Sequence, residues 1–183
     1  MRFQLKEFQP ALRFVGMFVG LYLSLNVLYG FWINSYDQVA DPATQWVTRQ
    51  SAGWLRLAGE QVQTRAKVGK PTIAISRGED AVVNVFEGCN GINVMIVFVA
   101  FVVAFGGATR KMMWFIPAGI VVIHLANLLR VGGLYLVAAY FAPYFYYVHK
   151  YAFTASIYVI VAVLWWWWIE RVNKVSLTRS KER

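Results

Sequence analysis

The sequence predicts an all-α integral membrane protein with about four transmembrane helices and a small extracytoplasmic insertion made of a helix and a β-hairpin. Of its 183 residues, 58% are hydrophobic and only 15% are charged. Several apolar runs approach or exceed the ~20 residues that a helix needs to cross a bilayer, and only residues 34–87 are polar over an extended length. We therefore expect one membrane domain, residues 1–183, with residues 34–87 inserted between the first and second spans.

The net charge of +9 points to the membrane rather than to nucleic acid, because the basic residues concentrate at the two chain ends and in one short loop. Such clusters hold helix ends in the cytoplasm. We expect cytoplasmic termini, an extracytoplasmic position for residues 34–87, membrane lipid as a contact, and no nucleic-acid partner.

The first predicted span is Phe14–Ile33, which follows Arg2, Lys6 and Arg13. A signal peptide has a shorter apolar core and a small-residue cleavage pattern such as Ala-x-Ala, and this segment has neither. We therefore expect an uncleaved helix whose N-terminal end is cytoplasmic.

Asp41-Pro42 predicts a helix start within the insertion, because a carboxylate caps free N–H groups and proline suits the first helical turn. Apolar residues at helical spacing then define one face: Trp46, Val47, Trp54, Leu55, Ala58 and Val62. The opposite face carries Arg49, Gln50, Arg56 and Gln63. The two tryptophans suit a helix lying among lipid headgroups, but packing on the other helices would bury the same face, and both readings stay open.

Two β-branched runs, residues 72–76 and 81–86, predict a hairpin around the turn Arg77-Gly78-Glu79-Asp80. The second run leads directly into Glu87-Gly88-Cys89. A hairpin at this point would stiffen the chain just before the cysteine.

Three further apolar runs complete the predicted bundle. Asn93–Phe105 is short for a full span unless its flanking glycines are included, and Arg110-Lys111 place its far end in the cytoplasm. The third and fourth predicted spans are Trp114–Tyr140 and Ala152–Ile169. They are joined by an aromatic turn, Phe141–Lys150, of the kind found at a membrane interface.

Three chemically notable side chains fall at the outer ends of these spans. Cys89, the only cysteine, lies where the second span begins, and the free N–H groups of a helix start favour a thiolate. Arg130 lies near the outer end of the third span, and His149 lies in the aromatic turn. A charged residue inside a span costs about 2.5–3.5 kcal/mol on insertion scales and is usually functional. We therefore predict that the three converge at one membrane face.

Each of these residues also has a plainer reading. A lone cysteine is often a small apolar filler, an arginine can extend to lipid headgroups, and an interfacial histidine is commonly solvated. Asn127, one turn before Arg130, would orient its guanidinium or simply hydrogen-bond a neighbouring helix. His124 lies deeper and is expected to be a hydrogen-bonded core residue. One cysteine and two histidines without a cluster predict no metal and no cofactor.

Three motifs in this order resemble the exosortase and archaeosortase family of membrane cysteine transpeptidases: Glu87-Gly88-Cys89-Asn90-Gly91-Ile92, Asn127-Leu128-Leu129-Arg130-Val131, and His149 ahead of a last span. The short length and four-span build are most similar to the small exosortases of Bacteroidetes, the exosortase F type. The resemblance covers the chain from the hairpin onward. Many family members have additional N-terminal spans, and residues 34–86 match nothing in the family pattern.

The resemblance implies an enzyme of the bacterial cytoplasmic (inner) membrane whose active site faces outward. In this reading Cys89 forms a thioester with the substrate, Arg130 stabilises the oxyanion and His149 transfers protons. The thiol pKa would be lowered by the arginine, the imidazolium and the helix start. The supporting residues would be Asn127, Asn90 and Glu87, the last by orienting His149 or binding substrate. The implied partners are exported proteins with a C-terminal sorting motif, a transmembrane helix and a basic tail, cleaved by transfer to an amine or to water.

Two other classes of function stay open. A non-enzymatic assembly factor or secretion-complex subunit would bind a partner helix through Arg130 and Asn127, and its cysteine would be inert. A small transporter would use Arg130 as a substrate-binding cation, although no inverted repeat is visible in the sequence.

Overall fold

The computed structural model describes the backbone of residues 5–181 and the side chains of residues 8–171, so the terminal basic residues outside this range are not described. Its helices are α1 (Leu5–Asn34), α2 (Pro42–Leu57), α3 (Ile92–Phe105), α4 (Thr109–Tyr140), α5 (Phe145–Tyr147) and α6 (Phe153–Lys181). Its strands are β1 (Val62–Ala66), β2 (Ile73–Arg77) and β3 (Asp80–Val85). Three short helical turns complete it: η1 (Glu87–Cys89), η2 (Ala142–Tyr144) and η3 (Val148–Ala152).

Three segments are long and apolar enough to cross a membrane: Phe8–Asn34, Thr109–Tyr140 and Ala142–Arg171. The predicted second span, α3, has only 14 residues. At 1.5 Å per residue this is about 21 Å, which is short of a bilayer core of ~30 Å. The protein is therefore mostly helical with three candidate spans among its described residues, and the expected count of four is not confirmed.

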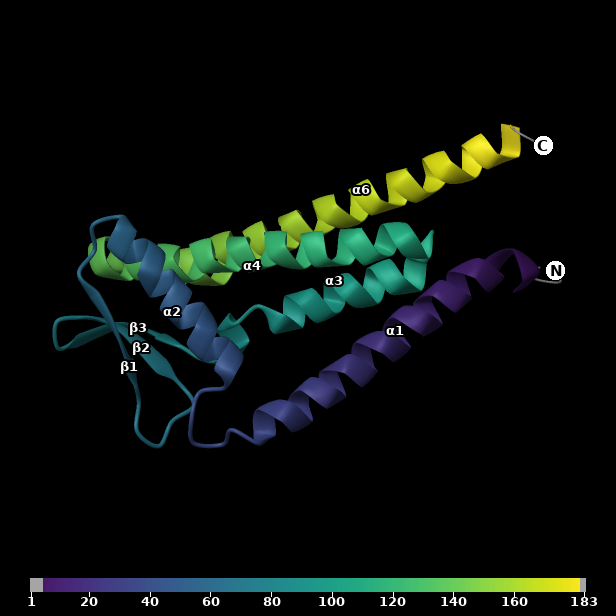
Figure 1. The fold of residues 1–183 in the computed structure, drawn as a ribbon. Coiled ribbons are helices and arrows are strands. Elements are labelled where there is room, and N and C mark those ends of the chain that lie inside the picture. The colour runs from purple at the N-terminus through teal and green to yellow at the C-terminus, as the bar shows by residue number, and fades with distance from the viewer. Residues whose placement is uncertain (1–4, 182–183) are drawn as a thin grey trace.

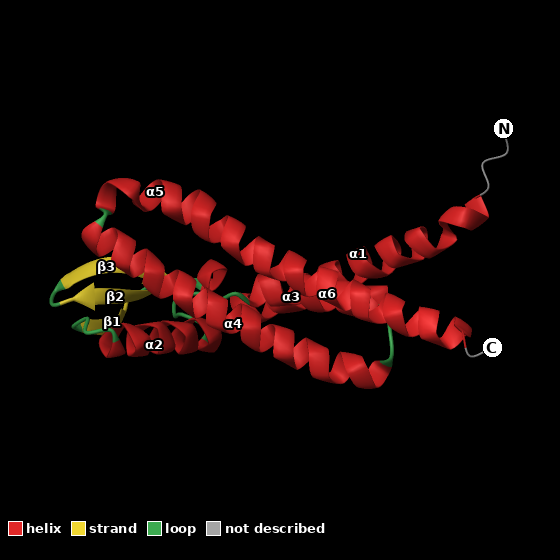
Figure 2. Ribbon diagram, turned by 90° about the horizontal axis from the view of Figure 1, so that it is seen from above, coloured by secondary structure: helices red, strands yellow, loops and turns green. Residues whose placement is uncertain are grey.

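The short helix α3 lies among the long helices and contacts α1, α4 and α6. Its apolar side chains join a buried cluster with α4 and α6: Phe98, Val102, Phe115, Ile123, Val161 and Trp168. Gly119 of α4 permits close packing, because a Cβ atom there would overlap the Phe98 ring. Both ends of the described chain lie at one end of this bundle, and α2 and the sheet lie at the other (Figures 1 and 2).

The three strands form an antiparallel sheet in the order β1-β2-β3. The predicted hairpin is confirmed as β2 and β3, in which Ile75 pairs with Val83. The strand β1 was not predicted, and the assignment of Val62 to the apolar face of the preceding helix is wrong. That helix ends at Leu57, and the chain reverses through Gly59, whose φ of 94° suits glycine. Val62 then enters the sheet, where it is buried.

The structure favours the packing alternative for α2. Asp41 caps the helix as predicted, and its side chain accepts a hydrogen bond from the backbone N–H of Thr44. Small and branched residues form the buried face: Thr44, Val47, Thr48, Ser51, Ala52 and Leu55. Trp54 donates from Nε1 to the carbonyl of Leu128 at 3.1 Å, and its ring lies against Gly132. The helix therefore packs directly on α4.

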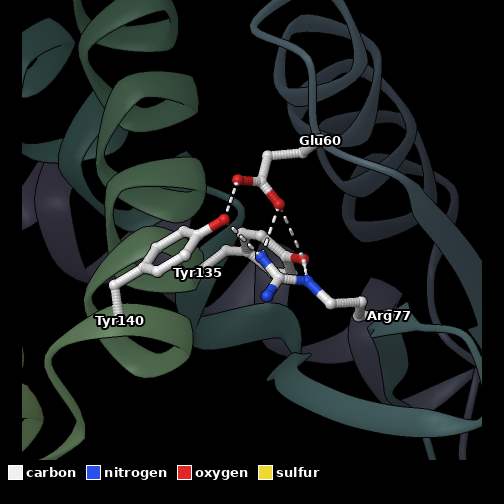
Figure 3. A network of polar contacts seen from close by, with 4 residues as sticks. All are labelled: Glu60, Arg77, Tyr135 and Tyr140. Carbon is white, nitrogen blue, oxygen red and sulfur yellow. Dashed lines mark hydrogen bonds and ion pairs between the residues drawn. The ribbon is translucent and has the colours of Figure 1, made fainter.

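A polar network fastens the sheet to the C-terminal end of α4 (Figure 3). The Arg77 guanidinium donates to Glu60 at 2.6 Å, to the Tyr140 hydroxyl at 2.8 Å and to the Tyr135 hydroxyl at 3.2 Å. The Tyr140 hydroxyl in turn donates to Glu60 at 2.6 Å. Because these residues belong to the α2–β1 connection, to β2 and to α4, the network sets the position of the sheet relative to the helix.

Candidate active site

Cys89 is the last residue of the turn η1 and is 6% exposed. Its backbone is held at both ends, since its N–H donates to the Phe86 carbonyl at 2.8 Å and its carbonyl accepts from Asn127 Nδ2 at 2.8 Å. The helix α3 begins only at Ile92, so the thiol is not in its first turn. The predicted placement of the cysteine at the helix start is therefore slightly off, and the helix dipole acts on it less directly.

The residues after the cysteine explain why the chain can bend sharply at this point. Gly91 has a φ of 84°, which favours glycine, and a Cβ atom there would meet the Asn127 amide at 3.1 Å. Asn90 is buried, donates from Nδ2 to the Tyr29 hydroxyl at 2.8 Å, and accepts from the Ile92 N–H at 2.9 Å. Asn90 therefore connects η1 to α1 and to the start of α3.

Arg130 lies on α4 one turn after Asn127, as the sequence predicted. Its Nη1 donates to the Asn127 Oδ1 at 3.4 Å, so the same amide contacts both the arginine and the Cys89 backbone. Its Nε is buried and has no hydrogen-bond partner. No ion pair joins Arg130 to a carboxylate in the part of the chain whose side chains are described. The guanidinium therefore keeps donor capacity for another group.

His149 lies in the π-helical turn η3, just before α6. Its ring is stacked on that of Phe145, with centroids 5.7 Å apart and planes at 6°. This stacking fixes the orientation of the imidazole. His149 and Cys89 line the same cavity, although they are far apart in the sequence.

This cavity has a volume of about 310 Å³ and is largely apolar. Besides Cys89 and His149, it is lined by residues of β3 and the turn after it, of α4 and of α5: Val82, Val83, Asn84, Val85, Phe86, Val131, Leu134 and Phe145. Arg130 is not a lining residue, but it directly precedes the lining residue Val131 on α4. The structure thus places Cys89 and His149 at one cavity, whereas Arg130 lies beside it on α4 without lining it.

The electrostatic environment of the thiol differs from the prediction. Burial raises the pKa of the Cys89 thiol above its ordinary value, the positive charge of Arg130 and the Phe86 backbone oppose this rise, and the Glu87 carboxylate adds to it. The expectation of a lowered pKa is therefore wrong for the free protein, because the loss of solvation outweighs the arginine.

Glu87 and His124, two polar residues singled out in the sequence, do not line the cavity. Glu87 makes no hydrogen bond or ion pair to His149 among the described residues, so the suggested orienting contact is not present. His124 is bonded to Gln50 Oε1 through Nε2 at 2.6 Å and stacked on Trp46, as expected for a packing residue. No group of three or more His, Cys, Asp or Glu side chains within residues 8–171 would hold a metal ion.

Sequence reasoning missed the walls of the cavity. The contribution of β3 was signalled only indirectly, by the strand that leads into the cysteine motif. Phe145 belongs to the aromatic turn Phe141–Lys150, whose composition indicates only a membrane interface. Neither pattern shows which side chains face the thiol, because that depends on how the sheet and the α5–η3 segment pack beside α4.

A family model described as a transmembrane exosortase matches residues 11–168 of the chain. The match begins within α1 and includes α2 and the sheet, so it extends beyond the region in which the motifs occur. No curated protein and no solved structure matches the chain.

Proposed function

The chain belongs to the transmembrane exosortase family, and we propose that it is a membrane cysteine transpeptidase that cleaves the C-terminal sorting signals of exported proteins. Family membership supports a role in membrane protein sorting. The assignment of the chemistry to particular residues is our proposal, as are the exosortase F subtype and the bacterial inner membrane as the location.

One observation carries the proposal: Cys89 and His149 line one cavity, and Arg130 contacts the same Asn127 amide that holds the Cys89 carbonyl. The three come from η1, η3 and α4, elements that are separate in sequence. A nucleophile and a proton carrier at one small apolar space, with a permanent cation on the neighbouring helix, are groups that can carry out acyl transfer through a cysteine.

In the first half of the reaction, His149 takes the proton of the Cys89 thiol as the sulphur attacks the carbonyl carbon of the substrate peptide. A base is needed because burial keeps the free thiol protonated. We assign stabilisation of the negative charge on the carbonyl oxygen to the Arg130 guanidinium, which has no carboxylate partner among the described side chains. The C–N bond then breaks, His149 protonates the departing amine, and a thioester remains on Cys89.

In the second half, an acceptor amine or a water molecule gives a proton to His149 and attacks the thioester carbon. The C–S bond breaks and the thiol is regenerated with the proton held by the imidazole. An amine acceptor gives transpeptidation and water gives proteolysis. The supporting residues act by position, since Asn127 holds the Cys89 backbone and Asn90 holds the turn that follows.

A membrane location of the enzyme supports a sorting signal as its substrate. A sorting signal contains its own transmembrane helix, so enzyme and substrate would meet within the same bilayer. The site lies toward the end of the bundle that carries α2 and the sheet, away from the chain termini (Figure 1). If that end is extracytoplasmic, the site would meet the sorting motif of an exported protein where it leaves the membrane.

The proposal is tested by replacing Cys89, Arg130 and His149 singly with alanine and measuring cleavage of a co-expressed exported protein that ends in a sorting motif, an apolar helix and a basic tail. We expect Cys89→Ala to abolish cleavage and Arg130→Ala to slow it about 100–1,000-fold, as for the loss of one oxyanion donor. We expect His149→Ala to slow it about 100-fold or more.

Matched controls are available because the chain has a second histidine and other arginines. His124→Ala and Arg110→Ala should leave cleavage within a few fold of the unmodified protein, provided each accumulates in the membrane at a similar level. Normal cleavage by Cys89→Ala would reject the enzymatic proposal and favour a non-enzymatic sorting or assembly component.

A further inference from the structure

The strand β3 has an open edge. It is the last strand in the order β1-β2-β3 and pairs only with β2. Within the described part of the chain, no hydrogen bond joins the backbone of Asp80–Val85 to any segment other than β2. Such an edge presents N–H and C=O groups that are a template for pairing with another chain.

This open edge runs along the cavity that contains Cys89 and His149. Five consecutive residues, Val82–Phe86, line the cavity. Successive side chains of a strand point to opposite faces, so lining by consecutive residues indicates a space that reaches the edge of the strand. The strand ends at Val85, and the turn η1 then carries the chain directly to Cys89.

The two outer strands of the sheet differ in their protection. On β1, Arg65 forms a two-pronged ion pair with Glu79, at 2.8 and 2.9 Å, and charges of this kind commonly guard edge strands. On β3, no charged residue occurs between Ala81 and Phe86. The facing wall of the cavity is also uncharged where Val131, Leu134 and Phe145 line it.

The edge is also held in place before any ligand arrives. The network of Glu60, Arg77, Tyr135 and Tyr140 fixes β2 to α4, and α4 supplies one wall of the cavity (Figure 3). The distance between the strand and that wall is therefore set by the fold. A preformed edge lowers the entropic cost of ordering a bound peptide.

We propose that the extended segment of the substrate next to the scissile bond binds as an added fourth strand on the free edge of β3, which delivers its carbonyl to Cys89. This inference rests on the proposed function and concerns how the same site recognises its substrate. Main-chain hydrogen bonds to β3 supply binding, and alternate substrate side chains face Val131, Leu134 and Phe145. The geometry therefore selects an extended, uncharged segment with apolar side chains at every second position.

The main test is an N-methyl scan of the substrate. A synthetic peptide that spans the sorting motif and the transmembrane helix is methylated at one backbone nitrogen at a time and is assayed with the full-length protein in lipid nanodiscs. Removal of a strand-pairing N–H should lower kcat/KM about 10-fold, equivalent to one hydrogen bond, at every second residue only. The intervening residues should tolerate methylation.

Cross-linking gives an independent readout on the protein. In a Cys89→Ser background, Asn84→Cys on β3 is compared with Gln63→Cys on β1; both positions are exposed on edge strands. A peptide carrying one cysteine should form a disulfide with Asn84→Cys at least 10-fold more readily than with Gln63→Cys. A disulfide between two copies of the Asn84→Cys chain, in place of one with the peptide, would assign the edge to self-association and overturn the inference.

The two proposals fail in different ways. If the unmodified peptide is not cleaved, or is cleaved equally by Cys89→Ala, the proposed function fails. If cleavage requires Cys89 but methylation has no alternating effect, the strand-addition inference alone is wrong.

Discussion

At the scale of single residues, the site depends on one buried amide. Asn127 is 1% exposed, its nitrogen holds the Cys89 carbonyl, and its oxygen accepts from Arg130. Buried polar groups are stable in proteins when they are hydrogen-bonded, and this one is bonded at both ends of its side chain. The Asn127 side chain therefore fixes the position of the Arg130 guanidinium relative to the Cys89 backbone.

The titration of Cys89 should report this arrangement directly. Burial raises the pKa of the thiol while the Arg130 charge lowers it, so alkylation should accelerate with pH through a midpoint above the ordinary thiol value of about 8.5. In Arg130→Gln the midpoint should move higher still, because the cation that favours the thiolate is gone. The measurement is the rate of alkylation by a small thiol reagent against pH.

Arg110→Gln is the control for this titration, since it removes a cation that does not act on the thiol. Its midpoint should equal that of the unmodified protein. A midpoint that is unchanged in Arg130→Gln would show that the guanidinium does not act on the thiol.

At the scale of the elements, Glu60 and Arg77 join the sheet to α4. Arg77 belongs to β2, Glu60 precedes β1, and both are hydrogen-bonded to Tyr140 of α4. Glu60 accepts hydrogen bonds from Tyr140 and Arg77, and these lower its carboxyl pKa below the usual range. A second Arg–Glu pair, Arg65 and Glu79, lies entirely within the sheet region, with side chains that are 44% and 88% exposed. The Arg77–Glu60 pair therefore links the sheet to a helix, whereas the Arg65–Glu79 pair is an exposed ion pair within the sheet region.

We expect Glu60→Gln to lower the thermal unfolding temperature at pH 7. A carboxyl with a lowered pKa stabilises the folded state above its ordinary pKa, and this contribution is lost as the pH falls through the lowered value. The difference between Glu60→Gln and the unmodified protein should therefore shrink well below pH 4. Unfolding followed by tryptophan fluorescence in detergent, at a series of pH values, measures it.

Glu79→Gln is the matched control, because exposed ion pairs contribute little to stability. Its unfolding temperature should stay within error of the unmodified protein across the series. Equal losses in the two variants at pH 7 would contradict a special role for the network between the sheet and α4.

At the scale of the whole molecule, the chain is polarised along the bundle. The described termini lie at one end, and α2, the sheet and the cysteine turn lie at the other (Figures 1 and 2). Arg110 and Lys111 begin α4 at the end that carries the termini. Because basic residues mark cytoplasmic ends, the polarity of the fold and the pattern of charge favour the same orientation.

Labelling of single cysteines tests that orientation, and the chain is convenient for it because Cys89 is the only one to remove. In a Cys89→Ala background, we expect Glu79→Cys to react with a membrane-impermeant maleimide in intact spheroplasts. Lys111→Cys should react only after the membrane is permeabilised. Both positions are exposed, so accessibility reports the side of the membrane. Labelling of Lys111→Cys in intact spheroplasts would reverse the proposed topology.

Much of the fold could be predicted because its signals are local. Long apolar runs indicate α1, α4 and α6, a carboxylate before proline indicates the start of α2, and β-branched runs around glycine indicate β2 and β3. The strand β1 escaped prediction because only its first residue is buried, so it shows no alternating apolar pattern. The expected second span is not confirmed because α3 has only 14 residues, fewer than a full crossing needs.

By itself, the sequence determined that this is a membrane protein with an inserted polar segment, and it singled out Cys89, Arg130 and His149 because such side chains are rare in or beside apolar helices. Only the tertiary structure decided that Cys89 is buried, that α2 packs on α4, and that β3 lines the same cavity as the thiol. The burial of a thiol and the exposure of a strand edge depend on contacts between segments that are distant in the sequence, so a local pattern of residues does not predict them.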